Sequence, residues 1–132
     1  MSGRDHFLLA DLVGEDVASV IFVRDHVQLD FDGPRFSLFV WPGVVTRTGL
    51  RHWGAPGYRD ALCGLIGQTV TAAEESREAG LVVRLGACSV TVKPRPDEVR
   101  GPEIAMLEGF ADRPDWMVWR PGEPPFDESG RL

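Results

Sequence analysis

Aromatic and basic side chains gather in one short segment of the sequence, between residues 41 and 60. A Gly-Ala-Pro-Gly turn is flanked by basic and aromatic residues on both sides, and a tryptophan ends the apolar run before it. Aromatic faces attract cations and planar groups, and concave sites carry a few polar groups that fix a ligand. We therefore predict a pocket for a small anionic or planar ligand, lined by Trp41, Arg51, His52, Trp53, Tyr58 and Arg59. The alternative is that the aromatic residues only pack against a sheet edge.

A second pair of indoles, Trp116 and Trp119, lies near the C-terminus on either side of Met117. Left uncovered, these side chains would form an interaction patch for a partner protein or a second copy. If they close the end of a sheet instead, they belong to the core, and we favour that interpretation.

The sequence offers little support for catalysis. His52 and Cys63 could act as base and nucleophile if the segment folded over the following helix, but no catalytic signature surrounds either residue. The three histidines are scattered and no Cys-x-x-Cys pair exists, so no metal site is predicted. We predict no catalytic residue, no metal and no cofactor, although a minor enzymatic role for the 41–60 segment stays open.

Composition and charge limit the function classes. The chain has 132 residues, 43% of them hydrophobic, with a formal charge of −6 and no block of basic residues. A phosphate backbone repels such a chain, so nucleic acid is disfavoured. No apolar run reaches the ~18 residues that a membrane span needs. We expect a cytoplasmic protein, and the scarcity of lysine and asparagine indicates a GC-rich bacterial source.

An internal repeat organises most of the chain. Leu62–Val70 repeats Leu9–Val17 at an offset of 53 residues. The identical positions are Leu9 and Leu62, Leu12 and Leu65, Gly14 and Gly67, Val17 and Val70, and Arg24 and Arg77. Further along, an offset of 52 matches Ser37 with Ser89, Val40 with Val92 and Pro42 with Pro94. The duplication therefore covers about 9–42 and 57–94, joined by a connector over 43–56 and followed by an extension over 95–132 within a single domain.

Each copy is predicted to be a short helix followed by three antiparallel strands. Apolar spacing predicts helices over 7–13 and 58–66, each stopped by a glycine. β-branched and alternating runs predict six strands, over 17–23, 27–32, 36–40, 69–75, 81–85 and 88–92. The expected fold is α+β, a six-stranded sheet or half-open barrel with two short helices. The connector is expected to be irregular, and the extension to hold a helix over 102–108 and a last strand over 116–119.

Three stretches resemble an uncharacterised family of small proteins from high-GC bacteria: Leu65–Val70, Gly57–Leu62 and Trp116–Trp119. The resemblance covers most of the chain, and this family has no assigned activity. It therefore implies no catalytic residue, ligand or partner.

Two function classes follow. The first is a non-catalytic interaction domain, with an antitoxin- or immunity-like partner of a basic protein as one form, because a charge of −6 steers the chain toward positive targets. The second is a small-ligand-binding protein or minor enzyme that uses the 41–60 segment. Unpaired sheet edges also favour a homodimer.

Overall fold

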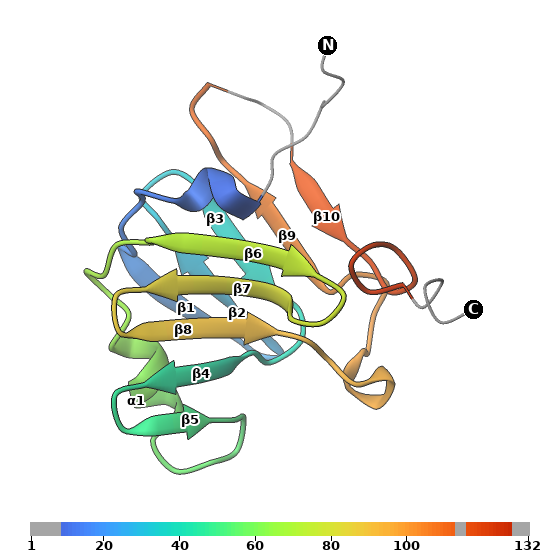
Figure 1. Ribbon diagram of the computed structural model, residues 1–132, viewed down its shortest axis with the longest axis horizontal. Helices are drawn as coiled ribbons and strands as arrows, with labels where there is room; N and C mark the ends of the chain where they lie inside the picture. The colour runs from blue at the N-terminus through green and yellow to red at the C-terminus, as the bar shows by residue number, and fades with distance from the viewer. Residues whose placement is uncertain (1–8, 113–115, 128–132) are drawn as a thin grey trace.

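Two five-stranded antiparallel sheets face each other in the computed structural model, which describes residues 9–112 and 116–127 (Figure 1). The first sheet has the order β1 (Ser19–Val23), β2 (His26–Asp30), β3 (Arg35–Leu38), β9 (Ala105–Glu108) and β10 (Met117–Trp119). The second has the order β5 (Gly49–Arg51), β4 (Gly43–Thr46), β8 (Cys88–Val92), β7 (Gly80–Leu85) and β6 (Ala72–Ser76). The helical elements are the 3₁₀ helices η1 (Leu9–Leu12) and η2 (Pro96–Glu98) and the α-helix α1 (Tyr58–Cys63).

The predicted α+β fold with six strands and two short helices is therefore wrong. The described residues contain ten strands and one α-helix of six residues. The connector over 43–56 holds β4 and β5, and the helix predicted over 102–108 is largely β9. Residues 105–108 favour a helix in isolation, but they pair with β3, and tertiary pairing overrides weak local propensity. No helix within the described ranges is long and apolar enough to cross a membrane.

Alternation of apolar and polar residues builds the core between the two sheets. In β2, Val27 and Leu29 are fully buried, while the residues between and beside them are half-buried on the outer face. In β7, Leu81 and Val83 take the same inward positions. Since successive strand residues point to opposite faces, β2 and β7 each contribute alternate side chains to one shared core.

The two copies meet around an approximate two-fold axis, and reciprocal hydrogen bonds mark it. Gly14 N–H donates to Val70 O over 2.9 Å, and Gly67 N–H donates to Val17 O over 2.8 Å. The two bonds are equivalent under the offset of 53, because Gly14 corresponds to Gly67 and Val17 corresponds to Val70. The duplication seen in the sequence is thus a structural symmetry.

Asp16 and Thr69 lie at the centre of this symmetric contact. They form an antiparallel bridge, and the Thr69 hydroxyl donates to the Asp16 carboxylate over 2.5 Å. Around them Leu12 and Leu65 are both fully buried, as equivalent residues should be.

The strand register corrects the offset in the third strands. Leu29 pairs with Phe36, and Val83 pairs with Val90, so the equivalent residues in β2/β7 and β3/β8 differ by 54. The turn after β6 is one residue longer than the turn after β1, which moves the offset from 53 to 54. The offset of 52 predicted from the sequence differs from the observed offset of 54 by two residues. Because side chains alternate with a period of two, both offsets put the same residue types inward.

The hairpin that follows each third strand crosses to the other copy. β4–β5 follows β3 in sequence but pairs with β8, whereas β9–β10 follows β8 but pairs with β3. Figure 1 shows the two hairpins at opposite ends of the molecule. The connector and the C-terminal extension are therefore equivalent segments, each supplying the fourth and fifth strands of the other copy's sheet.

This exchange predicts that a nicked chain stays assembled. We expect fragments 1–54 and 55–132 to remain unfolded alone and to form one cooperative, 1:1 complex when mixed, because each sheet needs strands from both fragments. Circular dichroism melting and size-exclusion chromatography measure this. A cooperative melt from either fragment alone would contradict it.

Candidate functional site

The 41–60 segment contains an aromatic cluster on its surface. Trp41 and Trp53 stack with ring centroids 4.2 Å apart and planes 7° apart, and Tyr58 meets both rings edge-on. Trp53 is 51% exposed, Trp41 is half-buried and Tyr58 is buried. Since the indoles stack at contact distance, no planar ligand fits between them, and one face of the pair is left toward solvent.

Tyr58 anchors this cluster to the sheet. Its hydroxyl donates to Pro42 O over 2.5 Å, and α1 begins at Tyr58 because Gly57 takes a left-handed conformation with φ 82°. Burial raises the pKa of Tyr58 well above its ordinary value of 10.0. The phenol is therefore a structural donor in its neutral form.

The pseudo-symmetry makes Trp53 equivalent to a tryptophan of the other copy. Trp119 pairs with Ala105, and extending the β4–β5 register two residues past Arg51 places Trp53 at the equivalent position beside Pro42. Trp119 is 1% exposed, packs edge-on against Phe36 with centroids 5.9 Å apart, and donates from Nε1 to a carboxylate. The same position carries a core indole in one copy and a surface indole in the other.

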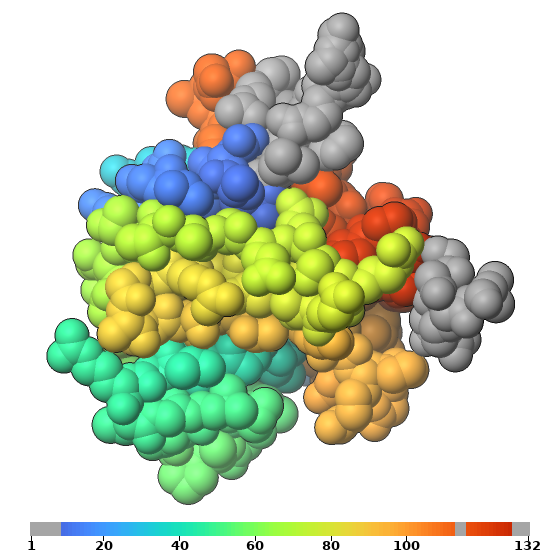
Figure 2. All heavy atoms as spheres, viewed as in Figure 1, coloured from blue at the N-terminus to red at the C-terminus, as the bar shows by residue number. Residues whose placement is uncertain are grey.

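A cleft of about 450 Å³ lies beside the indole pair, lined by Trp41, His52, Trp53, Arg95, Glu98 and Arg100. Figure 2 shows the surface hollowed between the β4–β5 hairpin and the 95–100 segment. Three of the six predicted ligand-binding residues, Trp41, His52 and Trp53, thus line this cleft, together with two arginines that the sequence did not indicate. Arg95 and Arg100 reach this place only because the chain after β8 crosses to the other copy.

The two predicted arginines lie outside this cleft, although Arg59 lines a neighbouring hollow together with Trp53 and Tyr58. The Arg59 guanidinium carbon lies 5.9 Å from the ring centroid of Phe22, a cation–π contact between α1 and β1. Arg51 lines a separate groove, between its hairpin and α1. The predicted set therefore does not form one pocket.

Near its turn, the β4–β5 hairpin carries apolar side chains on its outer face and polar side chains on its inner face. Val45 and Leu50 pair across the strands and are 37% and 53% exposed. Arg51 pairs with the buried Val44, so it and Thr46 lie on the inner face toward α1. An ordinary amphipathic hairpin would place these residues the other way round, and such violations of local rules are expected at functional sites.

The predicted C-terminal patch is divided. Trp119 lies in the core, as described above, whereas Trp116 is 60% exposed. Residues three apart in a strand point to opposite faces, so these indoles do not share a surface.

Other candidate chemistry gains no geometric support. Cys63 is exposed on α1, and no hydrogen bond joins it to His52. Among the described residues, no three histidine, cysteine or carboxylate side chains come together as a metal site.

No protein-family model, curated protein or solved structure matches this chain. The resemblance to an uncharacterised bacterial family therefore stays a prediction.

The stacked indoles predict a spectroscopic signature. Trp53→Ala should abolish exciton-coupled tryptophan bands in the circular dichroism spectrum and cost about 0.5–1.5 kcal/mol in the free energy of unfolding. Trp116→Ala, at a similarly exposed position, should preserve the bands and change stability by less than about 0.5 kcal/mol. Equal spectral effects of the two substitutions would contradict the stacking.

The buried phenol of Tyr58 leads us to expect that the free energy of unfolding falls at alkaline pH. Its pKa is raised in the folded state, so its contribution is fully present below the unfolded pKa near 10.0 and is lost as pH rises above that value. We expect a decline of at most about 1.4 kcal/mol per pH unit, measured by denaturant unfolding. The chain has a single tyrosine, so phenolate absorbance reports this group alone.

Tyr58→Phe provides the control for this prediction. It should remove the alkaline decline while costing about 1 kcal/mol at neutral pH for the lost hydrogen bond. Appearance of phenolate near pH 10 with the fold intact would show that Tyr58 is accessible.

Proposed function

We propose that this protein is a non-catalytic binding domain that recognises a partner protein through the outer face of the β4–β5 hairpin and through Trp53 in the turn after β5. The observation that supports this proposal is the apolar outer face of the hairpin. Val45 and Leu50 form an exposed apolar cross-strand pair, and Trp53 adds an indole that is 51% exposed. Tryptophan anchors surrounded by apolar contacts are typical of the energetic centre of protein interfaces.

The overall charge supports a basic partner. The chain carries a formal charge of −6, which attracts a positive protein over long distances and raises the association rate at low salt. An antitoxin- or immunity-like role, in which an acidic protein covers a basic one, is one form of this function. The two free cysteines fit the reducing cytoplasm, where we place the protein.

Position 50 provides the test of this surface. A photo-cross-linking amino acid at Leu50, introduced in the native host, should capture one basic protein, which is then purified for direct binding measurements. Leu50→Asp should weaken that complex about ten-fold or more, because it puts a charge in the apolar centre, and added salt should slow association. Leu50 is exposed, so the fold should be unaffected.

Ile66 provides a matched control. It is 48% exposed, close to the 53% of Leu50, but lies outside the hairpin. Ile66→Asp should leave binding unchanged. Equal loss from both substitutions, an acidic partner, or capture of a second copy of the chain alone would overturn the proposal, the last in favour of a homodimer.

Small-ligand binding by the 41–60 segment is the second candidate. It is favoured by the cleft beside Trp53, where a histidine and two arginines surround the indole pair.

A further inference from the structure

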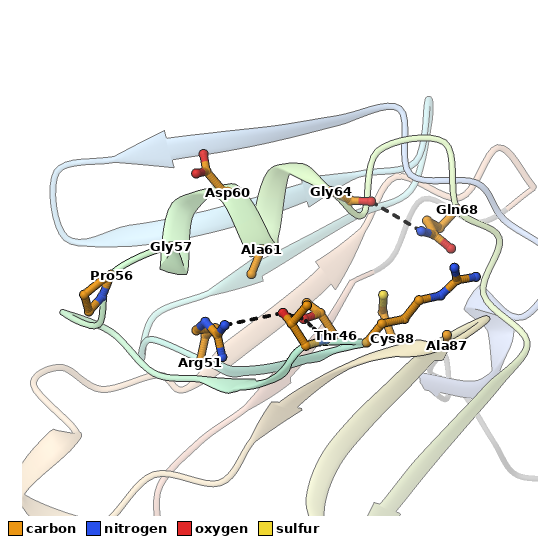
Figure 3. Close-up of a pocket in the computed structure, with 12 residues that line it drawn as sticks. Thr46, Arg51, Pro56, Gly57, Asp60, Ala61, Gly64, Gln68, Ala87 and Cys88 are labelled. Atoms are coloured by element: carbon orange, nitrogen blue, oxygen red, sulfur yellow. Dashed lines mark hydrogen bonds between the residues drawn. The ribbon is translucent and has the colours of Figure 1, made fainter.

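A groove of about 820 Å³ separates α1 from the inner face of the β4–β5 hairpin (Figure 3). Its hairpin wall comes from Thr46, Arg47, Thr48 and Arg51, and its helix wall from the Pro56–Gly64 stretch. Gln68 and Cys88 close one end, as Figure 3 shows. This size is within the range of small-molecule sites.

The Arg51 guanidinium is held in place from its own hairpin. Nη1 donates to Leu50 O over 3.1 Å, and Nη2 donates to the Thr48 hydroxyl over 3.4 Å. The backbone of Gly57 approaches from the other wall, so that a Cβ there would lie 3.7 Å from Nε. Guanidinium groups fixed in this way bind oxyanions with little loss of side-chain freedom.

The groove holds uncompensated positive charge in an acidic protein. Neither Arg47 nor Arg51 has an ion-pair partner among the described residues. Asp60 belongs to the helix wall, but Figure 3 shows its carboxylate directed away from Arg51. The polar side chains of Thr46 and Thr48 line the groove beside Arg51, and Gln68 lines its other end.

The other copy of the repeat carries an apolar residue at the position of Arg51. Val44 pairs with Arg51, and Leu107 pairs with Met117 at the equivalent place in β9–β10. Met117 is half-buried and packs against the core. The fold thus accepts an apolar side chain at a position where the first copy carries a fixed guanidinium.

We propose that this groove binds a small molecule through an oxyanion, a phosphate or carboxylate group, with Arg51 and Arg47 as the charged donors. Thr46 and Thr48 lie beside this group, Gln68 contacts the ligand at the other end of the groove, and the apolar atoms of Ala61 and Ala87 contact the rest of the ligand. This site is on the inner face of the hairpin, so it does not depend on partner binding by the outer face.

Titration with pyrophosphate and, separately, with citrate tests the proposal. Arginine Nε–Hε resonances of the full chain are followed by NMR at constant ionic strength. We expect saturable shifts of the Arg51 resonance with at least one anion. Saturation by pyrophosphate alone assigns a phosphate ligand, saturation by citrate alone assigns a carboxylate, and saturation by both assigns a general oxyanion site.

Arg51→Met is the decisive variant, because methionine occupies the equivalent position in the other copy. It should weaken anion binding about ten-fold or more while preserving the thermal melting profile. Arg51→Lys keeps the charge without the planar fork and should bind with intermediate affinity, which covers the case in which Arg51→Met fails to fold.

Arg24→Met removes the same charge from the exposed turn between β1 and β2 and serves as the control. It should leave anion affinity unchanged. No saturable shift with either anion, shifts spread equally over all arginines, or equal losses from Arg24→Met and Arg51→Met would overturn the proposal.

Discussion

The reciprocal pairing of residues 14–17 with residues 67–70 is the contact on which the rest of the structure depends. Four backbone hydrogen bonds in two symmetric pairs join the copies there. The contact puts η1 beside β6 and α1 beside β1, so each copy's helix lies at the first strand of the other. Those strands are sheet edges, whose unpaired backbone groups would otherwise favour uncontrolled association.

Much of the sheet structure was predictable because it follows from local alternation. The strict pattern of Val27 to Phe31 and the β-branched run of 88–92 each indicate one wet and one buried face, and both form strands. The β4–β5 hairpin lacked such a signal, since its turn at Arg47-Thr48 has no Asn-Gly or Asp-Gly pair and its outer residues are apolar. β9 is set by pairing with β3, which no local window contains.

The sequence indicated which segment of the chain holds the candidate site, but it did not indicate how the side chains of that segment are arranged. The grouping of Trp41, Trp53 and Tyr58 follows from hydrophobic packing near a turn. Arg51 and Arg59 lie on two different surfaces because one is the last residue of β5 and the other belongs to α1. Local sequence patterns did not reveal β5 or where α1 packs. Comparison of the two copies is the more informative guide. Met117 packs against the core where the first copy carries Arg51, and Trp119 is buried where the first copy carries the half-exposed Trp53.

The crossing of the hairpins also limits when the chain can fold during synthesis. The first sheet needs β10, so it cannot be completed until residue 119 has left the ribosome. Until then the apolar side chains of β1 to β3 have neither their neighbouring strands nor the facing sheet to cover them. A nascent chain of this protein therefore exposes the apolar faces of β1 to β3 until the second copy has been made, and incomplete chains with such exposed faces are prone to aggregation.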